Sequence, residues 1–413
     1  MGLKFLVETL AGSGSNWTDA DYVKQGAEIA HSAEKVWRLS NLILRVKPPL
    51  EDEIEMIKLM PDRTENFTIG VLKETFKCEN RVALTPLGVY DIYDALKDYR
   101  RGVGGFSKTL FGFFHFPDSK SYTKKLLDTK CNMIALELLK GDFETVAKKV
   151  GKEIQYLKDV LELVGYYKKS SSLVCLDMMS IATGLRTMSD AIDQFRKKKE
   201  LNITIFGYGA SGLSALWRCL KEESKNIKVR LVVKEQKLKE ISWIVRKFFT
   251  EKNVVLVMAE DDDTVKSYVR TSDIIVGTAV GPYGCTVKLL KAEEIKEIVE
   301  DLRTRFFVDI PLDNFDFVNE KGEVDNHVYT TNDVKFEKGY KETYYYRVPN
   351  VPSQLDHLSS RTLEIARLSF LIDLLENGLR KSAGADPLFA DAMVLNGKFV
   401  SKELETVVDL GGE

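Results

Sequence analysis

The feature that most constrains the fold is a glycine-rich turn that follows an apolar strand and opens a helix. Residues 202–206 predict a strand, residues 207–212 read Gly-Tyr-Gly-Ala-Ser-Gly, and residues 228–233 predict a second strand. In such a βαβ unit the first glycine makes the tight turn, the second lets the backbone approach a pyrophosphate, and the third lets helix pack on strand. The pyrophosphate then lies at the positive end of the helix. The residues that we expect at the dinucleotide are Gly207, Gly209, Ala210, Ser211 and Gly212.

The end of the second strand leaves the choice between NAD and NADP open. An acidic residue there binds the ribose hydroxyls of NAD, whereas a basic residue accommodates the 2′-phosphate of NADP. Here Lys234 and Glu235 follow the strand directly. Glu235 suits the ribose and Lys234 suits the phosphate, so both residues are candidate cofactor contacts.

The whole chain alternates short apolar runs with stretches of helical periodicity, which is typical of parallel sheets covered by helices. At roughly 150 residues per domain, 413 residues allow two or three domains. We therefore expect an α/β protein with two Rossmann-like, doubly wound parallel-sheet domains separated by a cleft. The expected parts are a substrate domain over 1–177, the dinucleotide-binding domain over 178–352, and C-terminal helices over 353–413 that return to the substrate domain. A Lys-rich stretch, 146–172, predicts a connecting helix.

Composition excludes several classes of protein. The chain has 60 Lys and Arg against 62 Asp and Glu, a net charge of −2, so the basic footprint of a nucleic-acid-binding protein is absent. No apolar run approaches the roughly 20 residues that cross a bilayer, so we expect a soluble, cytoplasmic protein without a membrane partner. Five cysteines stand singly, without CxxC spacing, and therefore predict neither a disulfide framework nor a metal site.

Four polar residues follow predicted strands, where an α/β sheet binds its ligands. Lys47 follows a strand over 42–46, and His115 follows one over 109–114. Arg81 comes after a strand over 68–72, and Asp313 after one over 305–309. Each residue also has an ordinary explanation. Arg81 could form a surface ion pair, Lys47 could merely flank a strand, His115 could be a packed histidine, and Asp313 could be a turn residue.

Several segments, taken together, resemble the family of alanine dehydrogenase and the NAD(P)-binding subunit of proton-translocating transhydrogenase. The resemblance spans about residues 4–400 and is specific because many landmarks occur together. These segments are AGSGSNWTDADYVKQGAEI (11–29), SAEKVWRLSNLILRVKPP (32–49), IGVLKET (69–75), ENRVALTP (79–86), TLFGFFHF (109–116), MMSIATG (178–184), GYGASG (207–212), VDIPLD (308–313) and VPNVP (348–352).

The resemblance implies a role for each strand-end residue. Arg81 would bind the substrate carboxylate, for which its planar fork is suited. Lys47 would hydrogen-bond the carbonyl or imine group. His115 would be the general acid/base, because the ordinary pKa of histidine, about 6.5, lies near neutral pH. Asp313 would orient ammonia or the carbinolamine. The resemblance also places Ser180 and Asn350 near the cofactor and its nicotinamide pocket, and gives no role to His31, His327 or His357.

One departure concerns chain order. The ENR block opens the chain in the family, whereas here residues 4–60 precede the corresponding block at 67–99. Because parallel βα units start and finish at the same edges of the sheet, short connections can join them in either order.

The resemblance favours an NAD(P)-dependent dehydrogenase that interconverts a 2-oxo acid plus ammonia with an L-amino acid by hydride transfer through an imine. Two alternatives stay open. One is reductive condensation of the oxo acid with the amine of a second amino acid, as in carboxyethylornithine synthase. The other is a nucleotide-binding module without catalysis. The substrate is a small molecule, and we expect a homo-oligomer.

Overall fold

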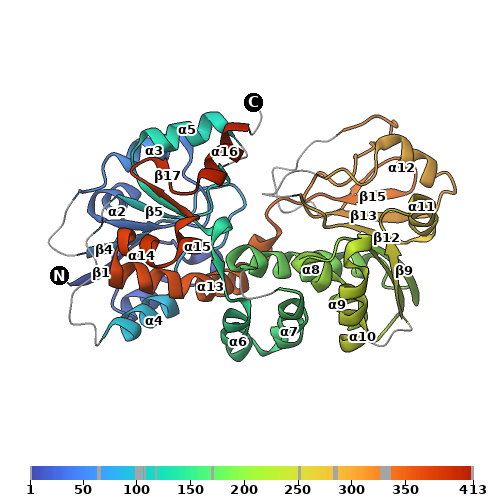
Figure 1. The fold of residues 1–413 in the computed structure, drawn as a ribbon, viewed down its shortest axis with the longest axis horizontal. Helices are drawn as coiled ribbons and strands as arrows, with labels where there is room; N and C mark the ends of the chain where they lie inside the picture. The colour runs from blue at the N-terminus through green and yellow to red at the C-terminus, as the bar shows by residue number, and fades with distance from the viewer. Residues whose placement is uncertain are drawn as a thin grey trace. The chain divides into compact units, whose positions relative to one another are not determined.

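The computed structural model describes residues 2–62, 67–97, 106, 108–116, 119–168, 172–249, 253–281, 287–325 and 336–410. The chain forms two compact units (Figure 1). The first unit comprises Met1–Val150, Ser170–Met179 and Leu355–Glu413. The second comprises Gly151–Lys169 and Ser180–Gln354. Each unit is an α/β layer structure built on its own sheet, so the predicted fold class is confirmed.

The sheet of the first unit has the strand order β17-β16-β6-β5-β3-β4-β1-β2. The six strands from β6 to β2 are parallel, whereas β16 runs antiparallel to β6 and β17 antiparallel to β16. Their central residues are buried on both faces, which explains the continuous apolar runs in the sequence. The strands are β1 (Leu3–Glu8), β2 (Glu28–Ala30), β3 (Leu42–Leu44), β4 (Phe67–Val71), β5 (Thr109–Gly112), β6 (Asn132–Ala135), β16 (Met393–Leu395) and β17 (Lys398–Phe399).

Helices cover both faces of this sheet (Figure 1). On one face a core of residues such as Trp37, Ile54 and Leu126 packs against Ile43 and Leu110 of the sheet. The helices on this face are α2 (Ala33–Leu39), α3 (Glu51–Ile57), α5 (Lys120–Asp128) and α16 (Lys402–Leu410). The other face carries α4 (Pro86–Leu96), α13 (Asp356–Asn377) and α14 (Leu379–Ala385). The C-terminal residues, for which we expected a return to the first domain, are thus part of the first unit.

The start of α4 is tied to α13. Thr85 caps α4 by accepting the N–H of Gly88 (3.2 Å), and Pro86 takes the first helical position, which needs no N–H partner. The N–H and hydroxyl of Thr85 donate to the buried Glu364 carboxylate of α13 (2.6 and 2.9 Å). One turn earlier on α13, the Ser360 hydroxyl accepts the N–H of Val82 (3.0 Å). These bonds hold the loop that carries Arg81 against α13.

The sheet of the second unit has the order β11-β10-β9-β12-β13-β15-β14, parallel except for β14. The chain leaves β9 in opposite directions, toward β10 and toward β12, and ligands bind at such a switch point. The strands are β9 (Glu200–Phe206), β10 (Asn226–Val233), β11 (Val254–Met258), β12 (Ile274–Gly277), β13 (Arg305–Asp309), β14 (Glu337–Lys338) and β15 (Thr343–Tyr346).

Helices of the second unit lie on both faces of its sheet (Figure 1). One group comprises α7 (Lys158–Tyr167), α9 (Ala210–Leu220) and α10 (Leu238–Phe248). The opposite face carries α11 (Asp262–Thr271) and α12 (Ala292–Ile298), whose apolar residues pack on β12 and β13. The helix α8 (Val174–Gln194) begins in the first unit and continues into the second.

Two expectations differ from the structure. The stretch 146–172 is not one helix, because α6 (Phe143–Glu153) and α7 are separated by a short turn at Gln155–Leu157. Residues Gly151–Lys169 also belong to the second unit, whereas we assigned them to the substrate domain. The Lys-rich sequence pattern continues across both helices, so the pattern alone does not indicate where the first helix ends and the second begins.

Within the described residues, no helix has both the length and the apolar character needed to cross a membrane. The same part of the chain contains no group of three or more His, Cys, Asp and Glu arranged to hold a metal. The cysteines that are described are free thiols, namely Cys78, Cys131, Cys175 and Cys219, and Cys285 lies outside the described residues.

Candidate active site

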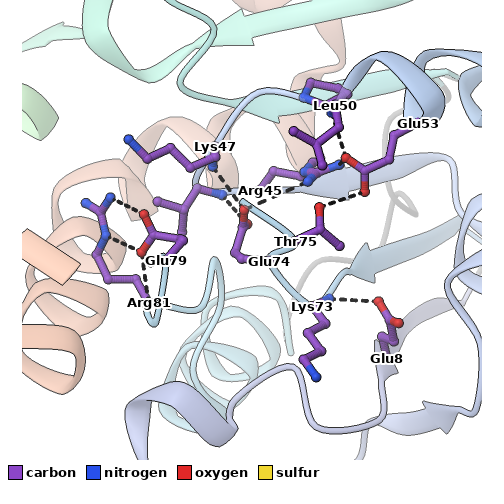
Figure 2. A network of polar contacts seen from close by, with 12 residues as sticks. Glu8, Arg45, Lys47, Leu50, Glu53, Lys73, Glu74, Thr75, Glu79 and Arg81 are labelled. Atoms are coloured by element: carbon purple, nitrogen blue, oxygen red, sulfur yellow. Dashed lines mark hydrogen bonds and ion pairs between the residues drawn. The ribbon is translucent and has the colours of Figure 1, made fainter. Parts of the chain in front are cut away.

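Lys47 lies three residues beyond β3, at the carboxyl edge of the first unit's sheet. Its N–H and that of Val46 donate to the two carboxylate oxygens of Glu74 (3.2 and 2.6 Å), which follows β4 (Figure 2). The Lys47 ammonium lies 5.3 Å from the centre of the Phe76 ring, a cation–π distance. The backbone of Lys47 is therefore fixed by a neighbouring strand.

His115 lies at the same edge, three residues beyond β5. Its N–H donates to Glu137 Oε1 (2.6 Å), and the N–H of Phe114 donates to both oxygens of the same carboxylate (3.1 and 3.2 Å). The backbone of His115 is left-handed, with φ of 51°. Such a conformation is uncommon for a residue with a side chain, although histidine adopts it more readily than most. The imidazole stacks beside the ring of Phe113, 5.9 Å between centres.

Arg81 lies in the loop between β4 and α4, and its side chain is almost completely buried. Its Nε and Nη2 donate to the two oxygens of Glu79 (2.7 and 2.6 Å), and Nη1 lies 3.1 Å from the sulfur of Met179. Figure 2 shows the Arg81 guanidinium and the Lys47 ammonium on the same side of this polar network. One edge of the guanidinium is thus already occupied by a carboxylate from its own loop.

Electrostatics tie these three residues together. The pKa of His115 is lowered to about 4, first by burial and then by the positive charges of Lys47 and Arg81. The structure thus gathers three of the four candidate residues in the first unit: Lys47 and His115 just beyond β3 and β5, and Arg81 in the loop between β4 and α4. At neutral pH the site holds a neutral imidazole beside two cations, which suits an anionic substrate and a group that accepts a proton.

Asp313, the fourth strand-end residue, lies in the second unit, beyond the end of β13. Asp309, the last residue of β13, holds this turn by accepting the N–H groups of Asn314 and Phe315 (3.1 and 3.2 Å). Burial raises the pKa of Asp309 to about 6, and these N–H groups together with Arg347 act in the opposite direction. Asp309 is buried and Asp313 is only partly so. The sequence singled out Asp313 and missed the supporting carboxylate.

The glycine turn of the second unit has the local geometry that a pyrophosphate site requires. Gly207 has φ of +104°, which a residue with a side chain rarely adopts, and it links β9 directly to the turn. A Cβ at Gly212 would lie 2.2 Å from the Gly207 carbonyl oxygen, so glycine is required where α9 packs. A Cβ at Gly209, the residue that precedes α9, would meet nothing within 4 Å. Open space therefore lies at the helix N-terminus, whose first N–H groups have no partner inside the helix, and a dinucleotide phosphate fits there.

The other expected cofactor contacts also lie in the second unit. Lys234 and Glu235 directly follow β10 and are exposed, and the Glu235 N–H donates to Glu260 (3.1 Å). Ser180 lies on α8, one turn before Gly184. At Gly184 this helix packs against the backbone of Ser211, because a Cβ there would lie 2.3 Å from the Ser211 carbonyl oxygen. Asn350 lies beyond β15 with φ of 57°.

Comparisons with known proteins show the family. The family model "Alanine dehydrogenase/PNT, N-terminal domain" matches residues 1–61, and "Alanine dehydrogenase/PNT, C-terminal domain" matches residues 184–402. An alanine dehydrogenase of Staphylococcus epidermidis is 23% identical over 408 residues, which cover 98% of this chain and 88% of that protein. Alanine dehydrogenase 2 of Staphylococcus aureus is 22% identical, over 92% of this chain and 82% of its own length.

Solved structures show the same fold. An L-alanine dehydrogenase superposes with a TM-score of 0.65 at 17% identity, over 99% of this chain and 91% of that one. A transhydrogenase from Sinorhizobium meliloti superposes with a TM-score of 0.59 at 14% identity, over 97% of this chain and 90% of that one. The C-terminal family model alone covers more than half of the chain. The chain therefore belongs to the alanine dehydrogenase/PNT family, as an oxidoreductase that uses a nicotinamide cofactor on an amino-acid substrate.

Proposed function

We propose that the protein interconverts a 2-oxo acid plus ammonia with an L-amino acid, through an imine, using NAD or NADP. The observation that carries this proposal is the grouping of Lys47, His115 and Arg81 at one sheet edge, where burial first, and then the charges of Lys47 and Arg81, lower the pKa of the imidazole to about 4. An anionic oxo acid complements the two cations. At physiological pH the imidazole is neutral and can accept a proton.

Arg81 and Lys47 would hold the substrate. The substrate carboxylate would pair with the Arg81 guanidinium, which Glu79 holds at Nε and Nη2 and whose Nη1 lies 3.1 Å from the Met179 sulfur. A guanidinium fixed by a carboxylate on one edge presents the other edge in a defined orientation. The Lys47 ammonium would donate to the carbonyl oxygen and stabilise negative charge that develops on it.

His115 and Asp313 would move protons and orient the amine. In the oxidative direction the neutral imidazole accepts the proton of the water that adds to the imine carbon, and returns it to the departing amine. Asp313 would orient the ammonia or carbinolamine nitrogen. A bound nicotinamide would supply the hydride acceptor for the substrate carbon, or the hydride donor in the reverse direction. The residues that would hold the cofactor are Gly207, Gly209, Ala210, Ser211, Gly212, Lys234, Glu235, Ser180 and Asn350.

The decisive assay follows oxidation of NADH and NADPH by the purified protein with a matrix of 2-oxo acids and amines. The proposal predicts oxidation that requires both an oxo acid and ammonium. Oxidation that requires the amine of an amino acid in place of ammonium would support the condensation reaction instead. If neither cofactor is oxidised with any pair although both bind, the protein is a nucleotide-binding module and the proposal is wrong.

A further inference from the structure

Glu74 and Glu137 hold the backbone of Lys47 and His115 in the same way. Lys47 is the candidate for stabilising negative charge on the substrate oxygen, and His115 is the candidate for proton transfer. Glu74 accepts the N–H groups of Val46 and Lys47 (2.6 and 3.2 Å). Glu137 accepts those of Phe114 and His115 (3.1 and 2.6 Å). In both cases one carboxylate binds two consecutive N–H groups, and the second of them belongs to the residue whose side chain would act on the substrate.

The strand order explains how this arrangement arises. The relevant part of the sheet runs β6-β5-β3-β4, so β5 and β3 are neighbours and β6 and β4 flank them. Glu137 follows the flanking strand β6, and Glu74 follows the flanking strand β4. Each carboxylate therefore reaches inward from a flanking strand to the strand that carries His115 or Lys47.

These bonds lie where the regular pairing of the sheet ends. The paired registers of β3 and β5 stop at Leu44 and Gly112, and the last backbone bond between the two segments runs from the Phe113 N–H to the Val46 carbonyl (3.1 Å). Beyond a strand end the backbone is usually mobile, and His115 also has a left-handed φ of 51°. A carboxylate that accepts two N–H groups fixes both peptide planes through charge-assisted hydrogen bonds.

We propose that Glu74 and Glu137 are positioning residues that fix the backbone of Lys47 and His115, so that both side chains meet the substrate in reactive geometry. The inference rests on the proposed function for the roles of Lys47 and His115. Positioning matters because displacement of a catalytic group by about 1 Å can cost a hundredfold in rate. Neither glutamate needs to contact substrate or cofactor for this role.

The chain supplies a matched control at the same edge. Glu8 ends β1 and accepts the N–H of Lys73, just beyond the neighbouring strand β4 (2.8 Å, Figure 2). The arrangement is similar, a carboxylate at one strand end that accepts a backbone N–H just beyond the neighbouring strand, although the Glu8 bond involves one N–H group where Glu74 and Glu137 each accept two. Lys73, however, has no proposed contact with the substrate.

The experiment compares Glu74→Gln, Glu137→Gln and Glu8→Gln in the full chain. Glutamine keeps the length of the side chain but replaces one acceptor oxygen by a donor, so it cannot accept both N–H groups equally. We expect kcat to fall at least tenfold in Glu74→Gln and Glu137→Gln, with KM for the cofactor within twofold of the parent. Glu8→Gln should keep kcat within twofold.

A second measurement reports the backbone itself, whether or not turnover is found. Amide hydrogen exchange should become at least tenfold faster at residues 46–47 in Glu74→Gln and at residues 114–115 in Glu137→Gln, with the rest of each unit unchanged. The pKa of His115, measured by NMR, should rise from about 4 toward 6.5 in Glu137→Gln, as the imidazole moves from its buried place beside Lys47 and Arg81.

The outcomes separate this proposal from the proposed function. If the parent shows no turnover, the proposed function fails. Amide hydrogen exchange and the NMR titration of His115 then still decide whether the two glutamates position Lys47 and His115. Unchanged exchange in Glu74→Gln and Glu137→Gln overturns the proposal, even if kcat falls, because the glutamates then act by another route. Faster exchange with unchanged kcat in an active enzyme overturns it as well.

Discussion

At the scale of the residue, the surroundings of His115 set its protonation state. Burial disfavours the charged imidazolium, and the positive charges of Lys47 and Arg81 disfavour it further, so its pKa falls from 6.5 to about 4. A bound substrate carboxylate would offset part of this repulsion and raise the pKa again. The acid/base strength of the imidazole is thereby coupled to occupancy of the site.

The first prediction concerns this titration. NMR of the histidine C2 protons should show the His115 imidazole titrating near pH 4 in the parent, and at a higher pH in Lys47→Met, because one of its two neighbouring cations is removed. The pKa should stay below 6.5, since burial is the largest cause of the shift. Because the folded state then binds fewer protons than the unfolded chain between about pH 6.5 and 4, the His115 contribution to stability is lost as the pH falls through this range. A His115 pKa at or above 6.5 in the parent contradicts the account.

The second prediction concerns the ion pair of Arg81 and Glu79, whose side chains are 3% and 0% exposed. Glu79→Ala leaves the guanidinium buried without its carboxylate, and should lower the free energy of unfolding by about 3 kcal/mol. Glu34→Ala is the control, because Glu34 pairs with Arg38 on an exposed helix face (54% and 55% exposed), where such a pair contributes about 0.5 kcal/mol or less. Urea unfolding of both variants measures the difference, and equal losses would show that burial of the pair is unimportant.

Individual residues were predictable to different degrees. Arg81, Lys47 and His115 stand next to apolar runs inside recognisable segments, so the sequence placed them at strand ends. The carboxylates that hold the backbone of Lys47 and His115, Glu74 and Glu137, lie 27 and 22 residues away from them along the chain. That partnership depends on which strands are neighbours in the sheet, and no local pattern reports it.

At the scale of the element, the glycine turn before α9 gives the third prediction. Gly209→Ala should preserve stability, because φ of −73° suits alanine and the new Cβ meets nothing within 4 Å. The methyl group would occupy the space expected for the pyrophosphate, so the Kd for NADH or NADPH should rise at least tenfold. Gly212→Ala should instead lower stability, because its Cβ would lie 2.2 Å from the Gly207 oxygen. Thermal unfolding and fluorescence titration distinguish the two, and unchanged cofactor binding by Gly209→Ala would contradict the site.

Most central strands were predictable from apolar runs, and their ends differ by only a few residues from the structure. Strands such as β15, β16 and β17 were not predicted, since they are short strands at or next to the margins of their sheets, where tertiary pairing decides more than local pattern. The helix α13 is buried around most of its circumference, because Ser360 and Glu364 bind the loop and cap beside α4. Because several of its buried residues are polar, the sequence pattern of this helix suggests an exposed face at positions that the structure buries.

At the scale of the whole molecule, the candidate residues are divided between the two units. Lys47, Arg81 and His115 belong to the first unit, whereas Asp313 and the cofactor turn belong to the second. The sequence predicted the return of the C-terminal segment but assigned Gly151–Lys169 to the other unit, since an amphipathic helix does not specify which sheet it covers. The β4 segment lies between β1 and β3 in the sheet, although it follows both in the chain. The carboxyl ends of parallel strands lie at the same edge of the sheet, so the order of the strands in the sheet does not fix their order along the chain. The exchange of sequence blocks relative to the family stays a prediction.

The fourth prediction tests whether catalysis draws on both units. Asp313→Asn should lower kcat at least tenfold, because the amide lacks the charge that would orient the amine, while the Kd for the cofactor stays within twofold. Glu320→Gln, an exposed change farther along the same segment, serves as the control and should leave kcat unchanged. Steady-state kinetics with cofactor titration provide both values. A fully active Asp313→Asn enzyme would exclude this residue from the site.

The most direct test of the central claim is the rate of cofactor oxidation, in the presence of an oxo acid and ammonium, by the parent, His115→Asn and Arg81→Lys. Asparagine tolerates the left-handed backbone at position 115, so the loop should be preserved while the proton-transfer group is lost. Loss of general acid/base catalysis, or of bidentate carboxylate binding, should lower kcat/KM by about 100-fold or more. We predict an active parent and two variants impaired to this extent. An active parent whose rate neither change lowers would contradict the assignment of the first unit's sheet edge as the reaction site.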